Sequence, residues 1–180
     1  MIYVFFANGF EEVEALAVVD VLRRAEIPTV CVGVGSDVIT GAHGISVICD
    51  TVDSAVSVDD AVDAVVLPGG MPGTLNLEKS PVVSLFVDKM AQQDKLICAI
   101  CAAPSILGHK GLLKGKKATC FPGFEGELEG AEVSADFVVE DGNIITAKGM
   151  GSAVKFGIAI GARFVGEEKM KKIEESLQCS

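Results

Sequence analysis

The sequence lacks the features of a membrane or exported protein. A membrane-spanning helix needs roughly 18 or more consecutive apolar residues, and no segment of the 180 residues reaches that length. The first ten residues, MIYVFFANGF, are apolar, but they have neither the basic flank nor the small-residue cleavage site of a signal peptide. We therefore expect a β-strand at the N-terminus and a cytoplasmic protein that does not bind membranes.

Basic residues are few relative to acidic ones. Lysine and arginine together number 15, aspartate and glutamate 25, and the formal net charge is −10 at pH 7. Such a surface repels nucleic-acid phosphates and anionic lipids, so we expect neither as a partner. Hydrophobic residues make up 49% of the chain, enough for a sizeable core in one globular domain over residues 1–180.

Cofactor and metal motifs are also missing. The segment GVGSDV lacks the third glycine of the dinucleotide-binding pattern G-x-G-x-x-G, and GLLKGKK does not have P-loop spacing. Among six cysteines there is a single C-x-x-C, Cys98 to Cys101, with no second pair of ligands for zinc. In a reducing compartment the cysteines are expected to be free thiols. Because the cofactor and metal motifs are missing, we expect no cofactor and no metal.

Apolar runs of strand length alternate with helical segments. Strands are predicted at 2–7, 29–34, 63–70 and 96–100, and helices at 11–25, 81–93, 102–107, 152–165 and 167–177. Short strands are predicted at 45–49, outside the main series, and at 118–120, 137–140 and 143–147, with a hairpin at EDGN between the last two. This order is typical of an α/β fold: a doubly wound, mostly parallel sheet with helices on both faces.

In such a sheet ligands bind at the carboxyl ends of the strands. Cys101 lies at one such end, where a strand gives way to a helix. The unpaired amides of a helix N-terminus stabilise a thiolate and lower the thiol pKa from about 8.5 to roughly 3.5–7.5. We therefore predict a reactive cysteine in a nucleophile elbow. The alternative is a buried structural cysteine, since cysteine is among the most buried residue types.

Glu14 occupies the apolar stripe of the first helix, together with Ala17, Val18 and Val21. Burial disfavours the charged form of a carboxyl group, so a raised pKa is predicted. Glu14 also follows the first strand and therefore lies at the same sheet edge as Cys101. Its alternative role is to complement the helix dipole, as we expect of the neighbouring Glu11 and Glu12.

Gly69 and Gly70 end the strand that begins at residue 63. Without side chains their backbone amides can approach a ligand closely and form an oxyanion hole facing Cys101. A tight turn is the alternative interpretation.

Two other cysteine chemistries are disfavoured. Strand alternation would place Cys98 and Cys101 on opposite faces, which argues against a redox disulfide between them. A Cys-His dyad with His109 is disfavoured, because His109 would lie about 12 Å along a helix from Cys101. The position of the only other histidine, His43, cannot be derived. A Cys-His-Glu triad with a late histidine is excluded, because no histidine follows residue 109.

Five segments in order, GFEEVEA, LPGG, AICAAP, ATCFPG and GMGSAVKFGIAI, resemble the ThiJ/PfpI superfamily and, more narrowly, its DJ-one-like branch. The resemblance covers nearly the whole chain. It implies a flavodoxin-like fold, a homodimer, and a cysteine prone to oxidation to the sulfinate. It also implies that Cys101 is the nucleophile, that Glu14 is the protonated acid bonded to it, and that the amides of Gly70 and Ala102 are oxyanion donors.

The sequence departs from the family pattern at several positions. Ala102 stands where the peptidase branch has histidine, which argues against a peptidase. Phe121 replaces a pocket histidine of relatives, and Met150 replaces the proline of a G-P-G segment; both are expected to line the pocket with Gly69. His43 stands where relatives often carry an arginine near the dimer interface.

The leading hypothesis is a cofactor-free enzyme that acts on small reactive carbonyls, of the glyoxalase or deglycase type. Cys101 would form a hemithioacetal with the substrate, and Glu14 would move the protons. The second hypothesis is a redox-sensing stress or chaperone protein, because a carboxyl group can also hydrogen-bond an oxidised Cys101. An intracellular cysteine peptidase is third.

Overall fold

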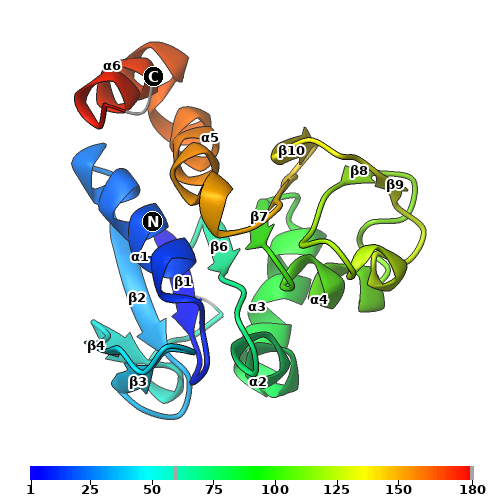
Figure 1. The fold of residues 1–180 in the computed structure, drawn as a ribbon. Coiled ribbons are helices and arrows are strands. Elements are labelled where there is room, and N and C mark those ends of the chain that lie inside the picture. Colours follow the sequence, from blue (N-terminus) through cyan, green and yellow to red (C-terminus); the bar gives the residue numbers. More distant parts are fainter. Residues whose placement is uncertain (59–60, 179–180) are drawn as a thin grey trace.

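The computed structural model describes residues 1–58 and 61–178 and contains a seven-stranded sheet in the order β10-β11-β7-β6-β1-β2-β5 (Figure 1). All neighbours in it are parallel except the β10–β11 pair. Its strands are β1 (Ile2–Phe6), β2 (Thr29–Gly33), β5 (Thr51–Val52), β6 (Ala64–Leu67), β7 (Leu96–Ile100), β10 (Val138–Asp141) and β11 (Ile144–Ala147). The predicted mostly parallel α/β sheet is therefore confirmed.

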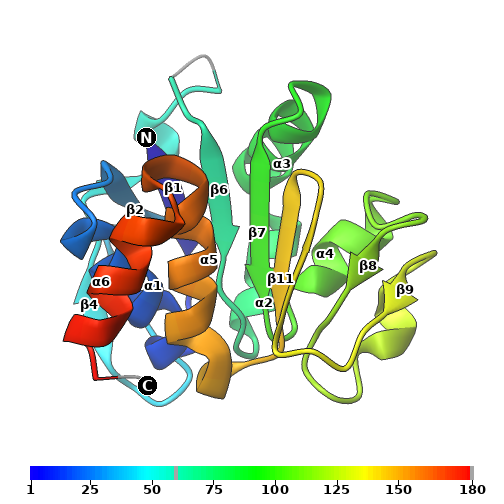
Figure 2. The same cartoon turned by 90° about the horizontal axis from the view of Figure 1, so that it is seen from above.

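Helices cover both faces of the sheet (Figure 2). One face packs against α1 (Glu12–Arg24), α5 (Ala153–Val165) and α6 (Glu167–Ser176), and the other against α2 (Gly73–Lys79), α3 (Pro81–Gln92) and α4 (Pro104–His109). The strand β1 is buried at all five positions. Its alternate side chains enter the two cores: Val4 lies on the α1 side and Phe5 on the α3 side.

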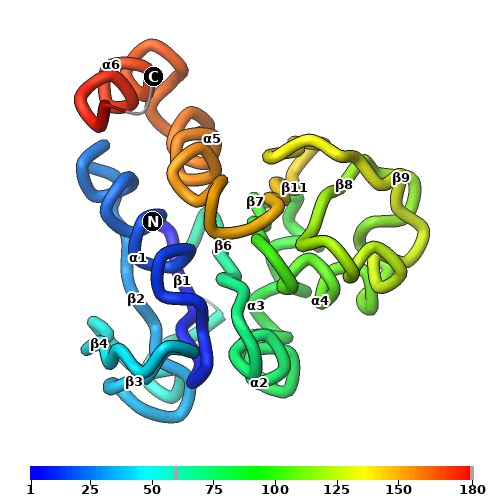
Figure 3. Tube along the Cα trace, in the orientation of Figure 1, coloured from blue at the N-terminus to red at the C-terminus, as the bar shows by residue number. Residues whose placement is uncertain are grey.

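The last long helix returns to the first one, as the chain trace shows (Figure 3). At Gly157 of α5 an added Cβ would lie only 3.1 Å from the Val21 side chain of α1. This small residue lets the two helices approach closely and fixes α1, which carries Glu14, against the sheet.

The minor elements differ in part from expectation. The segment predicted at 45–49 forms β4 (Ser46–Ile48), which pairs with the unpredicted β3 (Val38–Thr40) outside the main sheet, and a second small sheet joins β8 (Lys117–Ala118) to β9 (Glu132–Val133). The β10–β11 hairpin is confirmed. Short 3₁₀ helices occupy Asp53–Ala55, Glu125–Glu127 and Met150–Ser152. Among the described residues no helix is long and apolar enough to cross a membrane.

Candidate active site

Three chain segments meet at the carboxyl edge of the sheet. Cys101 directly follows β7 with φ 64°, a left-handed conformation that is unusual for a residue other than glycine. Gly70 follows β6 with φ 89°, and Glu14 lies in the first turn of α1. This strained corner turns the Cys101 side chain out of the strand and toward α1. Cys101 accordingly packs against the core cluster that α1 helps to form.

Glu14 is buried, with 1% of its surface exposed. Its Oε2 accepts a hydrogen bond of 3.0 Å from the Gly69 amide, and it is also hydrogen-bonded to the Cys101 side chain and the Met150 amide. Burial raises the pKa of Glu14 to about 7; the bond to Cys101 lowers it, and the charge of Glu11 raises it further. The predicted raised pKa of a carboxyl group on the apolar face is confirmed.

The predicted low pKa of the Cys101 thiol is wrong. Burial, followed by the charge and hydrogen bond of Glu14, raises the pKa of Cys101 to about 12. The Gly70 and Ala102 amides bond the sulfur and act in the opposite direction, but they are outweighed. The prediction relied on a helix N-terminus, whereas α4 begins only at Pro104 and the nearest charge is a carboxylate. The pair therefore rests as a thiol beside a carboxyl group that titrates near neutrality.

Gly69 allows the thiol and the carboxyl group to meet. A Cβ at this position would lie 2.5 Å from the Cys101 Cβ and 2.6 Å from Glu14 Oε2. Real Cβ atoms do not approach other atoms so closely, so a side chain here would push the two reactive groups apart.

An apolar hollow of about 310 Å³ adjoins the pair and is lined by Phe121, Phe137 and Met150, among others. The Phe121 amide donates to the Cys101 carbonyl oxygen at 2.8 Å. Phe121 and Met150, expected to line the pocket, thus lie beside Cys101 and Glu14. Phe137 was not anticipated: it is distant in the sequence from every motif, and its placement depends on how the 119–137 segment folds back.

The model of the DJ-1/PfpI family matches residues 1–163. The chain belongs to this family. A fruit-fly (Drosophila melanogaster) relative, Protein dj-1beta, is 34% identical over 97% of this chain and 94% of its own length. The Caenorhabditis elegans protein named glutathione-independent glyoxalase DJR-1.2 is 28% identical over 93% of this chain and 89% of its own. The structure of oxidized Toxoplasma gondii DJ-1 superposes with a TM-score of 0.94 at 31% identity, over 98% of this chain and 97% of that one.

In this DJ-1/PfpI family member, Glu12 does more than complement the helix dipole, contrary to expectation. It is 4% exposed, and its carboxylate accepts bonds from the His43 amide at 2.7 Å and from the Ile45 amide at 3.4 Å, and pairs with His43 Nδ1 at 2.8 Å. Burial acts to raise the pKa of Glu12, but these bonds outweigh it and leave the pKa below its ordinary value. Glu11 is the helix N-cap and accepts from the Glu14 amide at 2.7 Å.

One group of the described residues, Glu11, Glu12 and His43, has ligand atoms within 4.8 Å of one another, as a metal site requires. In the structure the Glu12 oxygens are already used by the loop that carries His43. Hydrogen bonding within the chain accounts for this grouping.

Both histidines are engaged away from the thiol. His43 pairs with Glu12, and His109 bridges Glu78 at 2.5 Å and Glu127 at 2.8 Å. The prediction that Cys98 and Cys101 lie on opposite faces of the sheet is wrong. Both belong to the α1 side of the sheet, because the left-handed conformation of Cys101 ends the strand alternation. Cys98 and Cys101 are free thiols.

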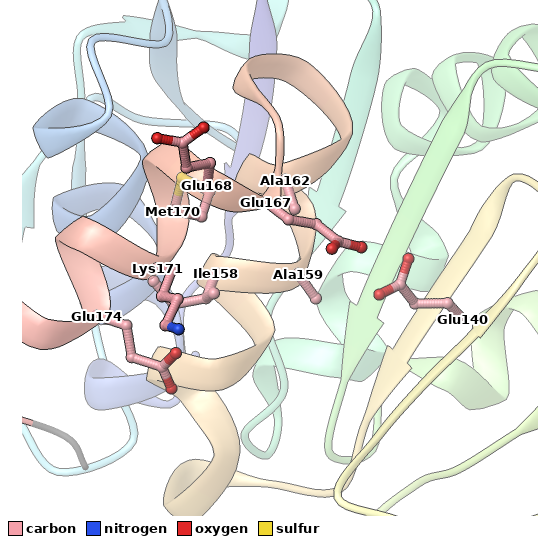
Figure 4. A pocket seen from close by; sticks show the side chains of 9 residues that line it. All are labelled: Glu140, Ile158, Ala159, Ala162, Glu167, Glu168, Met170, Lys171 and Glu174. Carbon is pink, nitrogen blue, oxygen red and sulfur yellow. The ribbon is translucent and has the colours of Figure 1, made fainter.

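A larger hollow of about 590 Å³ lies between α5, α6 and β10 (Figure 4). Ile158, Ala159 and Ala162 contribute apolar surface, and Glu140 and Glu167 are among the carboxylates on its rim. It contains none of the residues that surround Cys101, so size alone does not identify the reactive centre.

Proposed function

We propose that this DJ-1/PfpI family member is a cofactor-free enzyme that converts small 2-oxoaldehydes, such as methylglyoxal, into 2-hydroxy acids. The observation that carries the proposal is the hydrogen-bonded pair of Cys101, which is partly exposed, and Glu14, which is buried and has a pKa near 7. The name of the C. elegans relative, a glutathione-independent glyoxalase, supports this reaction class.

In the first step the Cys101 sulfur attacks the aldehyde carbon while the Glu14 carboxylate takes the thiol proton. A general base is needed here, because the pKa of Cys101, raised to about 12, keeps the sulfur protonated at neutral pH. The carbon–sulfur bond forms and the carbonyl electron pair moves to oxygen. The Gly70 and Ala102 amides, which bond the resting sulfur, would donate to this oxyanion. Glu14 then returns the proton and a hemithioacetal results.

In the second step Glu14 removes the hydrogen on the former aldehyde carbon as a proton and delivers it to the neighbouring carbon. The first carbon is thereby oxidised and the second reduced, so no external oxidant is required. The product is a thioester of a 2-hydroxy acid. Water adds its hydroxyl to the acyl carbon and a proton to the sulfur, which releases the acid and restores the thiol. A carboxyl pKa near neutrality suits a group that both accepts and donates protons.

The test is lactate formation from methylglyoxal, without glutathione or added metal, by wild type, Cys101→Ser and a control, Cys31→Ala. Cys31 is a buried free cysteine on β2, so the control removes a thiol without touching the site. Wild type and the control should form lactate, and Cys101→Ser should lose at least about a thousandfold in kcat. Equal turnover by wild type and Cys101→Ser would exclude the proposal.

A second candidate function, peroxide sensing, is favoured by one observation. Cys101 is partly exposed, whereas Cys31, Cys49, Cys98 and Cys120 are buried. One peroxide would convert the thiol to a sulfenic acid and water, and a second would give the sulfinate, which protonated Glu14 could hydrogen-bond. Peptide mass mapping after graded peroxide treatment should find oxidation at Cys101 first. Equal oxidation of the buried cysteines would contradict this function.

A further inference from the structure

The apolar hollow lies next to the reactive pair, because residues that line it contact both Cys101 and Glu14. The Met150 amide is hydrogen-bonded to Glu14, and the Phe121 amide is bonded to the Cys101 carbonyl oxygen at 2.8 Å. A Cβ added at Gly149 would lie 3.3 Å from Phe121 Cδ2 and 3.8 Å from Glu14 Oε1. The wall of the hollow at Gly149 therefore lies beside the carboxyl group that would move the protons.

The walls of this hollow include large apolar side chains that are exposed to solvent. Phe121 is 47% exposed, Phe137 63% and Met150 55%. Each has apolar surface that a ligand could remove from water, which is favourable in proportion to the area covered. Lys148 holds one wall in place: its Nζ lies 5.7 Å from the centre of the Phe137 ring and donates to the Ala135 carbonyl oxygen at 3.3 Å.

The volume of about 310 Å³ is at the lower end of the range for small-molecule sites, roughly 300–1,000 Å³. It has room for one aromatic ring. Two phenylalanines provide ring faces and edges against which a substrate ring can pack, and Met150 can adapt to its outline. A methyl substituent would cover little of this surface.

We propose that Phe121, Phe137 and Met150 form a substituent subsite, and that the preferred substrates are 2-oxoaldehydes bearing an aromatic group rather than a methyl group. The inference rests on the proposed function and narrows its substrate class. The reacting carbons would stay between Cys101 and Glu14, and the aromatic substituent on the second carbon would enter the hollow.

The experiment compares kcat/KM for phenylglyoxal and methylglyoxal, which share the reacting carbons and differ only in the substituent. Wild type should favour phenylglyoxal by about tenfold or more. Phe121→Ala and Phe137→Ala should each reduce that preference several-fold, since each removes one wall. The matched control is Leu85→Ala, an exposed apolar residue on α3, and it should leave the preference unchanged.

The outcomes separate this inference from the proposed function. If wild type converts both aldehydes equally well, or if neither phenylalanine variant changes the ratio, the subsite is wrong while the enzyme proposal stands. If wild type converts neither aldehyde, the enzyme proposal fails, and binding of the two product acids decides on the subsite. Calorimetry should then give tighter binding of mandelate than of lactate, with the difference reduced in Phe121→Ala. Equal binding would overturn the inference.

Discussion

Two buried carboxyl groups two residues apart, Glu12 and Glu14, behave in opposite ways. Both lie in the first turn of α1, and they are 4% and 1% exposed. Glu12 faces the loop that carries His43, and its pKa is lowered. Glu14 faces the thiol of Cys101, and its pKa is raised to about 7.

The difference lies in what each carboxylate meets. Burial acts to raise the pKa of both groups, but Glu12 has the His43 ring and two backbone amides of that loop as partners. Glu14 also accepts from two backbone amides, those of Gly69 and Met150, but in place of the His43 ring it has a weakly acidic thiol, and the negative charge of Glu11 lies nearby. Hydrogen bonds to its charged form therefore make Glu12 a structural anion. The charged form of Glu14 is stabilised less, which leaves Glu14 free to exchange a proton near pH 7.

Exchanging each carboxylate for an amide should separate the two roles most strongly. Glu14→Gln should lower kcat for methylglyoxal by about 10²- to 10⁴-fold, because the amide cannot accept the thiol proton. Glu12→Gln should retain kcat within a few-fold but lower the free energy of unfolding by about 1–3 kcal/mol. Steady-state kinetics and urea unfolding check both expectations. Loss of turnover in Glu12→Gln alone would reverse the assignment.

Separating Glu14 from the thiol should also be costly. In Gly69→Ala the new methyl group would lie 2.5 Å from the Cys101 Cβ and 2.6 Å from Glu14 Oε2. We expect a loss of about 3 kcal/mol in unfolding free energy and little turnover. The control Gly126→Ala places a methyl group in open space and should be neutral in urea unfolding. A fully stable, active Gly69→Ala would contradict the close packing of the pair.

The pH dependence of stability should have opposite signs for the two groups. The folded-state pKa of Glu14 lies above its unfolded value, so the folded protein binds more protons and loses stability as pH rises from about 4.5 to 7, by on the order of 3 kcal/mol. The lowered pKa of Glu12 instead stabilises the fold above its unfolded pKa, and this is lost in acid. Urea unfolding at each pH measures this. The decrease in unfolding free energy toward pH 7 should be absent in Glu14→Gln and still present in Glu12→Gln.

The smallest expected effect concerns His43, whose side chain is exposed. Pairing with Glu12 raises its pKa, so its stabilising contribution is present below about pH 6.5 and is lost as pH rises through the raised value. His43→Gln should move the pKa of Glu12 upward and leave that of Glu14 in place. Carboxyl NMR titration of both glutamates measures this, and a shift confined to Glu14 would contradict the separation.

The sequence predicted the positions of Cys101 and Glu14 and the raised pKa of Glu14, but not the raised pKa of Cys101. Strand ends and an apolar helical stripe are local patterns, and they placed both residues at one sheet edge. The pKa of Cys101 depends on the carboxylate of another element and on where α4 begins, and neither follows from local pattern. The partners of Glu12 lie in a loop 31 residues away, and Phe137 lines the hollow together with Phe121 and Met150 from two other segments. Periodicity does not reveal such contacts between segments.

The pH–rate profile of methylglyoxal conversion between pH 5 and 9 tests the central claim most directly. If Glu14 accepts the proton of a protonated Cys101, kcat/KM should rise through an apparent pKa near 7 that belongs to the coupled pair. Glu12→Gln should keep that midpoint. A flat profile, which a preformed thiolate would give, or the same midpoint in the residual activity of Glu14→Gln, would contradict the account.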